Sequence, residues 1–296
     1  QVMDMKSCRL CPRSCGVDRT RGQRGVCGMG DKLTVARAAL HFWEEPPISG
    51  KNGSGAVFFS GCSLGCGFCQ NTEISHGCFG KEISEARLRE IFEELIAKGA
   101  HNINLVTASH FVPKILPALT PKLPVPVVFN CGGYESVETL RRLSGKVDIY
   151  LPDLKYAEGE LAKALSRAPD YFPVACRAID EMVRQVGPCQ FDEDGMLQKG
   201  VIIRHLILPG QVQNSLKVLD YIAEHFPKDT VLLSLMAQYV PSGRVKNTPP
   251  FDRTVTEEEY RAVVDWLYML GLENGFLQER SAATAAYLPD FSLEGV

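Results

Sequence analysis

The stretch Ala56-Val57-Phe58-Phe59-Ser60-Gly61-Cys62-Ser63-Leu64-Gly65-Cys66-Gly67-Phe68-Cys69 leads from a short apolar run into three closely spaced cysteines. The apolar run predicts a buried strand, so the cysteines fall on the loop that follows it. Their spacing is C-x3-C-x2-C, and three thiolates on one loop can hold three corners of a [4Fe–4S] cube. Because the motif has no fourth ligand, one iron keeps an open position at which a substrate or cofactor can bind.

Zinc is the alternative metal for these three cysteines. A structural zinc site needs a fourth ligand, and His76 and Cys78 are the nearest candidates. The glycines at positions 61, 65 and 67 favour the bulkier cluster, because backbone without side chains can wrap closely around it. The cysteines outside the two clusters of the chain are interpreted as buried or free thiols: Cys78, Cys131, Cys176 and Cys189.

Beyond this stretch, short apolar runs alternate with helical patterns. The expected strands are 56–60, 102–106, 125–130, 147–151, 201–208 and 231–235. The expected helices are 84–98, 111–119, 136–143, 170–186, 214–225 and 256–270. Ser84 is a plausible N-cap of the first helix, and Thr256 with Glu259 fits a capping box at the start of the last one. Six strands alternating with helices predict an α/β fold with a parallel sheet that is covered on both faces.

Polar residues cluster where the expected strands end. Since the carboxyl ends of parallel strands meet at one edge of the sheet, we expect these side chains to lie close together. Arg204 interrupts an apolar strand and needs a carboxylate partner there, whereas His205 fits either a core position or a catalytic one. The polar side chains at these strand ends, where a parallel barrel binds its ligands, are Thr107, Ser109, Asn130, Asp153, Lys155, Arg204 and Gln238. The candidates for catalysis are His110, Cys131 and His205.

The first 50 residues carry a second cysteine group, with the spacing C-x2-C-x3-C-x11-C. Its members are Cys8, Cys11, Cys15 and Cys27. Four thiolates suit a closed structural zinc site or a second iron–sulfur centre, and four unliganded thiols are the remaining alternative. We expect residues 1–50 to form a small, irregular, cysteine-rich module and residues 51–296 to form the main domain. Trp43 and Glu44, in the connection, either line the mouth of the main domain or cover its bottom.

Composition narrows the class of protein further. The chain has 296 residues, a net charge of −3 and 45% hydrophobic residues, as in a globular protein with a sizeable core. The slightly negative charge disfavours general nucleic-acid binding, and no run approaches the roughly 18 apolar residues that a membrane helix needs. The first residues lack the apolar core of a signal peptide. Clustered thiols in such a chain indicate metal ligands in a reducing compartment, and we expect the cytoplasm.

With the aromatic Phe68 directly before the last cysteine, the central motif resembles the signature of the radical S-adenosylmethionine (SAM) superfamily. The resemblance implies a partial (βα)6 barrel of parallel strands, similar to a TIM barrel, with the cluster loop after the first strand. It also implies that the open iron binds the amino and carboxylate groups of SAM, and that Phe68 lies near the adenine.

The segment Asp153-Leu154-Lys155 resembles the Asp-x-Lys element of the glycyl-radical-enzyme activases, typified by the pyruvate formate-lyase activating enzyme. In that branch, the Asp and an acidic residue after the third strand hold a monovalent cation beside SAM, and the Lys contacts the ribose or the methionine carboxylate. Here the third strand ends on the neutral Asn130. The chain also departs from the superfamily's Gly-Gly-Glu after the second strand, where Thr107 and Ser109 can supply oxygens instead or cap the next helix.

The resemblance implies reductive cleavage of SAM to a 5′-deoxyadenosyl radical that abstracts hydrogen from a substrate. The substrate is then a glycyl radical enzyme, or alternatively another protein, a peptide or a small metabolite. An electron donor such as a flavodoxin or a ferredoxin is the implied partner. The alternative from a different class is a non-catalytic iron–sulfur or zinc carrier or an interaction protein.

Overall fold

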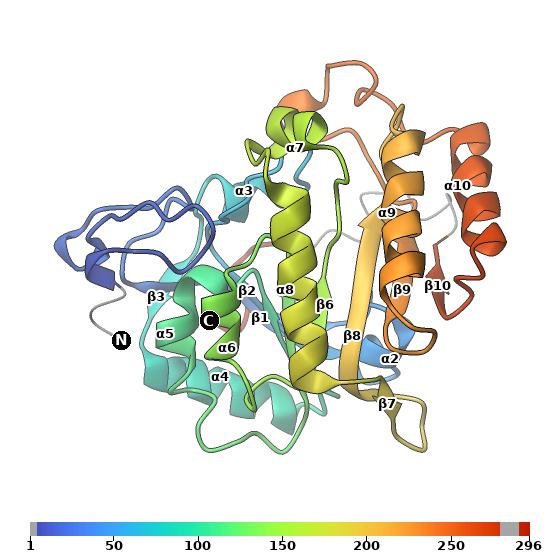
Figure 1. Ribbon diagram of the computed structural model, residues 1–296. Helices are drawn as coiled ribbons and strands as arrows, with labels where there is room; N and C mark the ends of the chain where they lie inside the picture. Colours follow the sequence, from blue (N-terminus) through green and yellow to red (C-terminus); the bar gives the residue numbers. More distant parts are fainter. Residues whose placement is uncertain (1–4, 279–289) are drawn as a thin grey trace.

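The computed structural model describes residues 5–278 and 290–296, which form an α/β fold around a mostly parallel sheet (Figure 1). Parallel pairing joins strands in the spatial order β2-β4-β5-β6-β8-β9-β10. Their bounds are β2 (Ser54–Phe59), β4 (Ile103–Val106), β5 (Val127–Cys131), β6 (Ile149–Pro152), β8 (Leu197–Leu206), β9 (Leu232–Met236) and β10 (Gly275–Leu277). Antiparallel pairing adds β1 (Leu33–His41) to β2, β3 (Lys81–Ile83) to β1, and β7 (Gln190–Phe191) to β8. Within these residues the sheet is open, with β3 and β10 at its edges.

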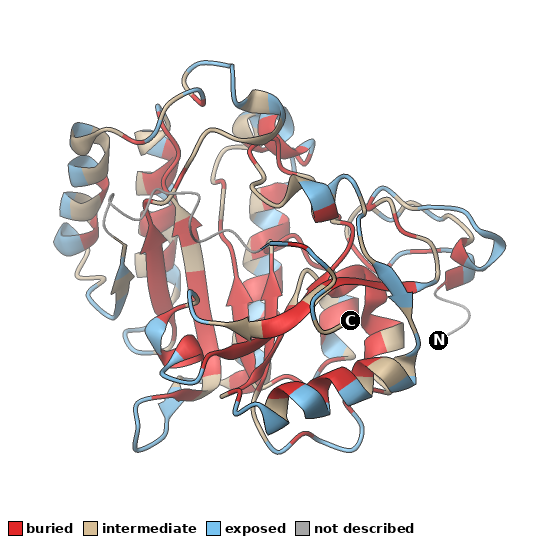
Figure 2. Ribbon diagram, turned by 180° about the vertical axis from the view of Figure 1, so that it is seen from behind, coloured by how far each residue is buried: buried red, intermediate tan, exposed pale blue. Residues whose placement is uncertain are grey.

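Helices follow the parallel strands and pack against one face of the sheet. Helix α8 contacts β6 and β8, and Figure 1 shows α8 and α9 in front of these strands. From behind, most of the sheet is buried, whereas the edge strands β3 and β10 are largely exposed (Figure 2). The helix bounds are α2 (Pro46–Ser49), α3 (Thr72–Ser75), α4 (Glu85–Ala97), α5 (Val112–Ile115), α6 (Val137–Arg141), α7 (Gly159–Ser166), α8 (Tyr171–Val186), α9 (Val212–His225) and α10 (Glu257–Met269). Short 3-10 turns are η1 (Arg19–Arg21), η2 (Ser109–Phe111) and η3 (Gly243–Val245).

All six expected strands are confirmed, as β2, β4, β5, β6, β8 and β9. Both expected helix starts are also confirmed. The Ser84 side chain accepts a hydrogen bond from the Arg87 amide at the start of α4, and Thr256 and Glu259 form a complete capping box at the start of α10. The helix expected at 111–119 is shorter, because regular structure ends at Ile115 and Pro117 has no amide hydrogen with which to continue it.

The segment 33–41 differs from the expectation of an irregular N-terminal module. It forms β1, which pairs with β2 along the sheet. Alanines occupy three of its positions, so its strand propensity is weak, and pairing with β2 overrides that local preference. Residues 5–32 remain without strands and lie beside α5 and α6 (Figure 1). The division into a module at 1–50 and a main domain at 51–296 stays a prediction.

Helix α2 closes the amino end of the parallel strands. Its Ile48 is fully buried in an apolar layer with Val128, Ile149 and Ile202, which come from three different strands. Asn102 donates a hydrogen bond to the Ile48 carbonyl at 2.7 Å and thereby ties α2 to the start of β4. Helix α2 therefore covers the bottom of the sheet.

The described helices include none that is both long and apolar enough to cross a membrane.

Candidate functional site

The cysteine loop after β2 lies at the carboxyl ends of the parallel strands and is held from two sides. On one side, the amide of Gly67 donates to the carbonyl of Leu165 in α7 at 2.6 Å. On the other side, the segment around η3 covers the loop, with the Ser242 hydroxyl donating to the Phe68 carbonyl at 2.8 Å. The Phe68 ring is buried near Tyr156 and Tyr239, at centroid distances of 6.5 and 6.1 Å.

Of the three cysteines of this loop, Cys66 is buried, and Cys62 and Cys69 are half-buried. Burial raises the pKa of Cys62 to about 12, and it also raises the pKa of Cys69, whose Sγ lies 3.2 Å from the Ser75 hydroxyl. Metal binding must therefore displace protons from these thiols. Among the described residues, no group of three or more His, Cys, Asp or Glu side chains is arranged to hold a single metal ion. A [4Fe–4S] cube is larger than one ion, and three thiols on one loop match its donor set.

The two candidates for a fourth zinc ligand lie in different places. The His76 Nδ1 is hydrogen bonded at 2.9 Å to the Ser75 hydroxyl, and a side chain at Gly65 would lie 3.6 Å from the His76 Nε2, so His76 lies beside the cysteine loop. The Cys78 thiol lies 3.9 Å from the Cys27 carbonyl, on the side of the N-terminal segment. Among the described residues neither of them completes a group that could hold a single metal ion.

Lys155 follows the end of β6, and its side chain lies close to the cysteine loop. Its ammonium pairs with Asp153, and the two side chains are only 15% and 12% exposed, so the alternative of a surface ion pair is wrong. Lys155 also interacts electrostatically with Cys66 and Cys69. Burial alone would lower the pKa of Lys155, but Asp153 and then Cys66 hold it above its ordinary value. A stable positive charge therefore lies beside the predicted cluster ligands.

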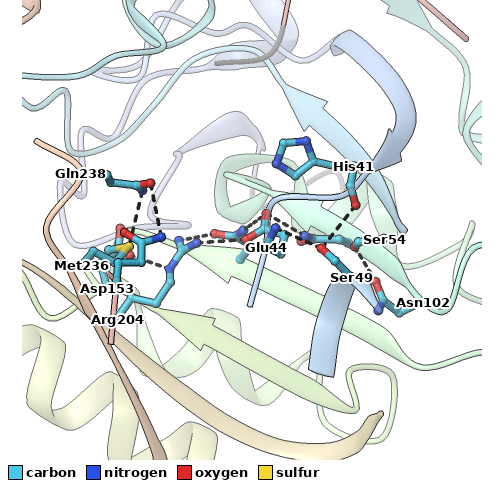
Figure 3. A network of polar contacts seen from close by, with 12 residues as sticks. His41, Glu44, Ser49, Ser54, Asn102, Asp153, Arg204, Met236 and Gln238 are labelled. Carbon is cyan, nitrogen blue, oxygen red and sulfur yellow. Dashed lines mark hydrogen bonds and ion pairs between the residues drawn. The ribbon is translucent and has the colours of Figure 1, made fainter. Parts of the chain in front are cut away.

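Arg204 on β8 is the centre of a polar network inside the sheet's curve (Figure 3). Its Nε donates to Asp153 at 2.9 Å and its Nη2 donates to Asn130 at 2.6 Å. Its Nη1 lies 3.3 Å from the Glu44 carboxylate. The expectation that Arg204 faces a carboxylate is thereby confirmed. Burial would raise the pKa of Asp153, but Arg204 and Lys155 together hold it below its ordinary value.

Glu44 and Glu45 enter this network from the connection between β1 and α2. Glu44 accepts hydrogen bonds from the side-chain amides of Asn104 and Asn130, each at 3.1 Å. Burial raises the pKa of both glutamates, although Arg204 opposes the shift. One oxygen of the Glu45 carboxyl, Oε2, has no hydrogen-bond partner among the described residues. The sequence placed Glu44 at the mouth or the bottom and missed its contact with Arg204; the only local signal was an acidic pair before two prolines.

The segment after β4 reaches the same edge of the sheet. Thr107 has a left-handed backbone with φ of 60°, unusual for a β-branched residue, and its amide donates to the Asn130 carbonyl at 2.9 Å. The Ser109 hydroxyl is hydrogen bonded to Glu135. The alternative that Thr107 or Ser109 caps the next helix is wrong, because η2 has Ala108 at its N-cap and no side-chain cap bond.

The three catalytic candidates lie outside the Arg204 network. The His110 Nε2 is 2.8 Å from the Ser60 carbonyl, and burial lowers the pKa of His110 to about 4. His205 follows Arg204 along β8 and points to the opposite face, where its ring nitrogens bond to the Leu154 carbonyl and the Ser215 hydroxyl at 2.7 and 2.9 Å.

Cys131 and Gln238 complete the strand-end residues. Cys131 is buried beside Glu135, and burial raises the pKa of its thiol well above the ordinary value. Gln238, after β9, is half-buried; its Nε2 lies 3.7 Å from the Met236 sulfur (Figure 3), and its carbonyl accepts from Gln70 of the cysteine loop at 3.4 Å.

The four N-terminal cysteines share one electrostatic environment. Cys27 interacts with Cys8 and Cys15, and Cys11 interacts with Cys8 and Cys27. A side chain at Gly25 would lie 3.1 Å from the sulfur of Cys15 and 3.5 Å from that of Cys27. The structure therefore places the Cys15 and Cys27 sulfurs near one another, but among the described residues no three of the four cysteines are arranged to hold a metal ion, and a metal there stays a prediction.

Two arginines of the N-terminal segment form hydrogen bonds to the cysteine loop, to the end of α7 and to the segment after β4. Arg13 donates to the carbonyl of Ser63 at 2.8 Å, within the cysteine loop, and to that of Ser166 at the end of α7 at 2.7 Å. Its guanidinium also lies 5.2 Å from the centre of the Tyr134 ring. Arg19 is fully buried and donates to the His110 carbonyl at 2.6 Å.

A cavity of about 780 Å³ lies away from this chemistry. It opens at the amino end of the strands beside Pro46, His101 and Met196. A cavity of about 200 Å³ lies between the two cysteine groups and is lined by Cys27, Cys62 and their neighbours. The strand-end network and the cysteine loop, rather than the cavity at the amino end, are the candidate site.

Comparison with known proteins gives one relative that decides the family. The uncharacterized protein MJ0674 of Methanocaldococcus jannaschii is 30% identical over 271 residues, which cover 88% of this chain and 74% of that protein. The chain belongs to the MJ0674 family. The name of MJ0674 states no activity, and no family model matches the chain.

Solved structures resemble this MJ0674-family chain only weakly. SuiB of Streptococcus suis bound to S-adenosylmethionine has a TM-score of 0.48 and 15% identity over 74% of this chain, which spans less than half, 45%, of SuiB. Methylornithine synthase (PylB) has a TM-score of 0.49 and 13% sequence identity, and the match covers 77% of this chain and 71% of that protein. A domain of pyruvate-formate lyase-activating enzyme from Bacteroides vulgatus has a TM-score of 0.40 and 12% sequence identity. That match covers 66% of this chain and 91% of the domain. TM-scores below 0.5 do not establish a shared fold, so function must be argued from the residues of this chain.

Proposed function

We propose that this protein is a radical SAM enzyme whose [4Fe–4S] cluster is held by Cys62, Cys66 and Cys69. One observation carries the proposal. Lys155, from the Asp-x-Lys segment after β6, is bonded to Asp153, which in turn is bonded to Arg204, and a side chain at Gly132 would contact both Leu64 of the cysteine loop, at 3.3 Å, and Lys155, at 3.9 Å. The cysteine loop and the strand-end residues thus meet at one edge of the parallel sheet, which supports a partial barrel with its site at the strand ends.

When bound, the cluster and SAM supply an electron transfer that yields methionine and a 5′-deoxyadenosyl radical able to abstract hydrogen from a substrate. This chain's residues would orient SAM and exclude water. Lys155 offers three N–H donors to the methionine carboxylate or the ribose. Phe68 packs its ring where the adenine would lie. The cofactor-binding assignment further includes Thr107, Ser109, Asn130, Asp153, Arg204 and Gln238.

The finer assignment is an activating enzyme of the pyruvate formate-lyase type, acting on a glycyl radical enzyme. The support is the Asp153-x-Lys155 segment, now seen beside the cysteine loop. Modification of another protein, a peptide or a small metabolite is the alternative, and we assign a flavodoxin- or ferredoxin-type electron donor. The N-terminal cysteines hold zinc or a second iron–sulfur centre in this proposal. Oxidation-sensitive clusters suit the cytoplasm.

Replacing each central cysteine by alanine tests the proposal. After anaerobic reconstitution and reduction, Cys62→Ala, Cys66→Ala and Cys69→Ala should each lose the cluster absorption and the formation of 5′-deoxyadenosine from SAM. Cys176→Ala, in α8 and away from the loop, is the matched control and should keep both. The measurements are iron and sulfide content, visible absorption and chromatography of the nucleoside product.

Two outcomes contradict this assignment in different ways. Wild-type protein that binds a cluster but never cleaves SAM is a carrier or an interaction protein. Central cysteine variants that keep iron and SAM cleavage place the cluster elsewhere.

A further inference from the structure

Arg204 occupies the position that the activase resemblance gives to a monovalent cation. That cation would take oxygen ligands from Asp153 and from the residue at the end of the third parallel strand, here Asn130. The Oδ1 atoms of both residues instead accept hydrogen bonds from the Arg204 guanidinium, at 2.9 and 2.6 Å. The other oxygen of Asp153 accepts from Lys155. Each of these oxygens already accepts from a cationic side chain, so a Na⁺ or K⁺ ion bound to them would have to share its ligands with a positive charge at close range.

Glu44 supplies the carboxylate that the neutral Asn130 lacks. One of its oxygens accepts from Asn130 and Asn104, each at 3.1 Å, and the other lies 3.3 Å from Arg204. Its side chain is only 10% exposed. Two carboxylates therefore face the guanidinium from opposite elements, Asp153 from the end of β6 and Glu44 from the connection before α2 (Figure 3).

Charge and backbone geometry both hold this arrangement in place. Among the groups that are bonded to one another, Glu44 and Asp153 face Arg204 and Lys155, two negative charges against two positive ones, while burial raises the pKa of the third acid of the network, Glu45. The backbones of Asp153 and Arg204 form a parallel bridge, and the Leu154 amide donates to the Arg204 carbonyl at 2.8 Å. Strand pairing thus fixes the backbone from which the Arg204 side chain extends, and the hydrogen bonds to Asp153 and Asn130 orient its guanidinium.

We propose that the Arg204 guanidinium, neutralised by Asp153 and Glu44, replaces the monovalent cation, so that this protein binds SAM without Na⁺ or K⁺. The proposal rests on the proposed function for the presence of SAM, but ion binding is measurable without SAM.

Ion binding tests the proposal first. The reconstituted protein is dialysed to equilibrium against radioactive rubidium, which substitutes for K⁺, and against radioactive sodium, with and without SAM. Wild-type protein should retain neither ion above the level of a matched buffer. Retention of about one ion per chain that competes with K⁺ or Na⁺ overturns the proposal. Absence of SAM binding rejects the proposed function instead, and the ion measurement without SAM still decides this point.

Thermal unfolding provides the second measurement. At constant ionic strength, the wild-type midpoint should be the same in KCl, NaCl and tetramethylammonium chloride. Arg204→Gln leaves Glu44 and Asp153 without their shared guanidinium, so its midpoint should fall, and K⁺ or Na⁺ should restore part of the loss while tetramethylammonium does not. In the double variant Glu44→Gln/Arg204→Gln that ion effect should disappear. A wild-type midpoint that rises specifically with K⁺ or Na⁺ contradicts the proposal, and this arm does not depend on whether the variants fold.

Discussion

At the scale of single residues, Asp153 and Lys155 show how two side chains at a strand end connect the cysteine loop to the Arg204 network. Only glycine fits at position 133 beside the Asp153 backbone, because a side chain there would lie 2.0 Å from the Asp153 carbonyl and the backbone φ is +80°. Lys155 and Arg204 each donate to one oxygen of the Asp153 carboxylate. The pair therefore places the Lys155 ammonium at the expected SAM site, while the Asp153 carboxylate stays neutralised by Lys155 and Arg204.

Removing the Lys155 ammonium should weaken SAM binding and leave the cluster intact. A charged hydrogen bond contributes about 1.5–3 kcal/mol, which corresponds to about one to two decades in affinity. Lys155→Ala should therefore raise the Kd for SAM by about 10- to 100-fold at unchanged iron content, since Asp153 keeps its bond to Arg204. Calorimetric titration of the reconstituted protein measures this, with the exposed Lys163→Ala in α7 as the control. Equal affinities for the two variants would remove Lys155 from the SAM site.

His205 should make the protein less stable in acid. Burial lowers the pKa of His205 to about 4 from an ordinary 6.5, so the unfolded chain binds its proton first as the pH falls. Stability should therefore drop below pH 6.5, by roughly 2 kcal/mol between pH 7 and pH 5 from this residue. His205→Gln should lack that component, so the wild-type advantage should shrink over this range in denaturant unfolding. Parallel curves for wild type and variant would show that His205 does not titrate in this way.

At the scale of elements, the parallel strands and their helices could be predicted because buried strands read as continuous apolar runs and helix starts carry Ser or Thr caps. The shorter strands β3, β7 and β10 offer only two or three residues of pattern. Strand β1 is long, but its alanines conceal it. The local sequence pattern could not show that Glu44, in the connection after β1, contacts Arg204, because the two residues are 160 positions apart in the sequence.

The N-terminal segment should stabilise the cysteine loop through Arg13. Its guanidinium bridges the loop and the end of α7 by bonds that a shorter side chain cannot make. Arg13→Ala should lower the free energy of unfolding by about 1.5–3 kcal/mol and speed hydrogen exchange of the Gly67 amide. Arg9→Ala, an exposed neighbour, is the control. If both variants exchange equally fast at Gly67, the segment does not restrain the loop.

At the scale of the whole molecule, distant parts of the chain converge on one edge of the sheet. The N-terminal segment contacts the cysteine loop through Arg13, and the Gly61 position admits no side chain because the Cys27 carbonyl would lie 2.6 Å away. At the other end of the chain, the Glu294 carbonyl accepts from Ala38 of β1. The strand-end residues could be predicted from topology alone, since parallel strands bring their carboxyl ends together. The packing of the cysteine-rich segment on the loop could not, because its residues 5–32 have no periodic pattern.

The central claim is that a cluster on the loop after β2 has an open iron that binds SAM at the strand ends. Electron–nuclear double resonance on the reduced, reconstituted protein tests it most directly, with SAM carrying nitrogen-15 in its amino group. The account predicts a nitrogen-15 coupling to the cluster in wild-type protein and in Cys176→Ala, and its loss when Cys62, Cys66 or Cys69 is replaced. A reduced wild-type cluster that shows no such coupling at saturating SAM would contradict the account.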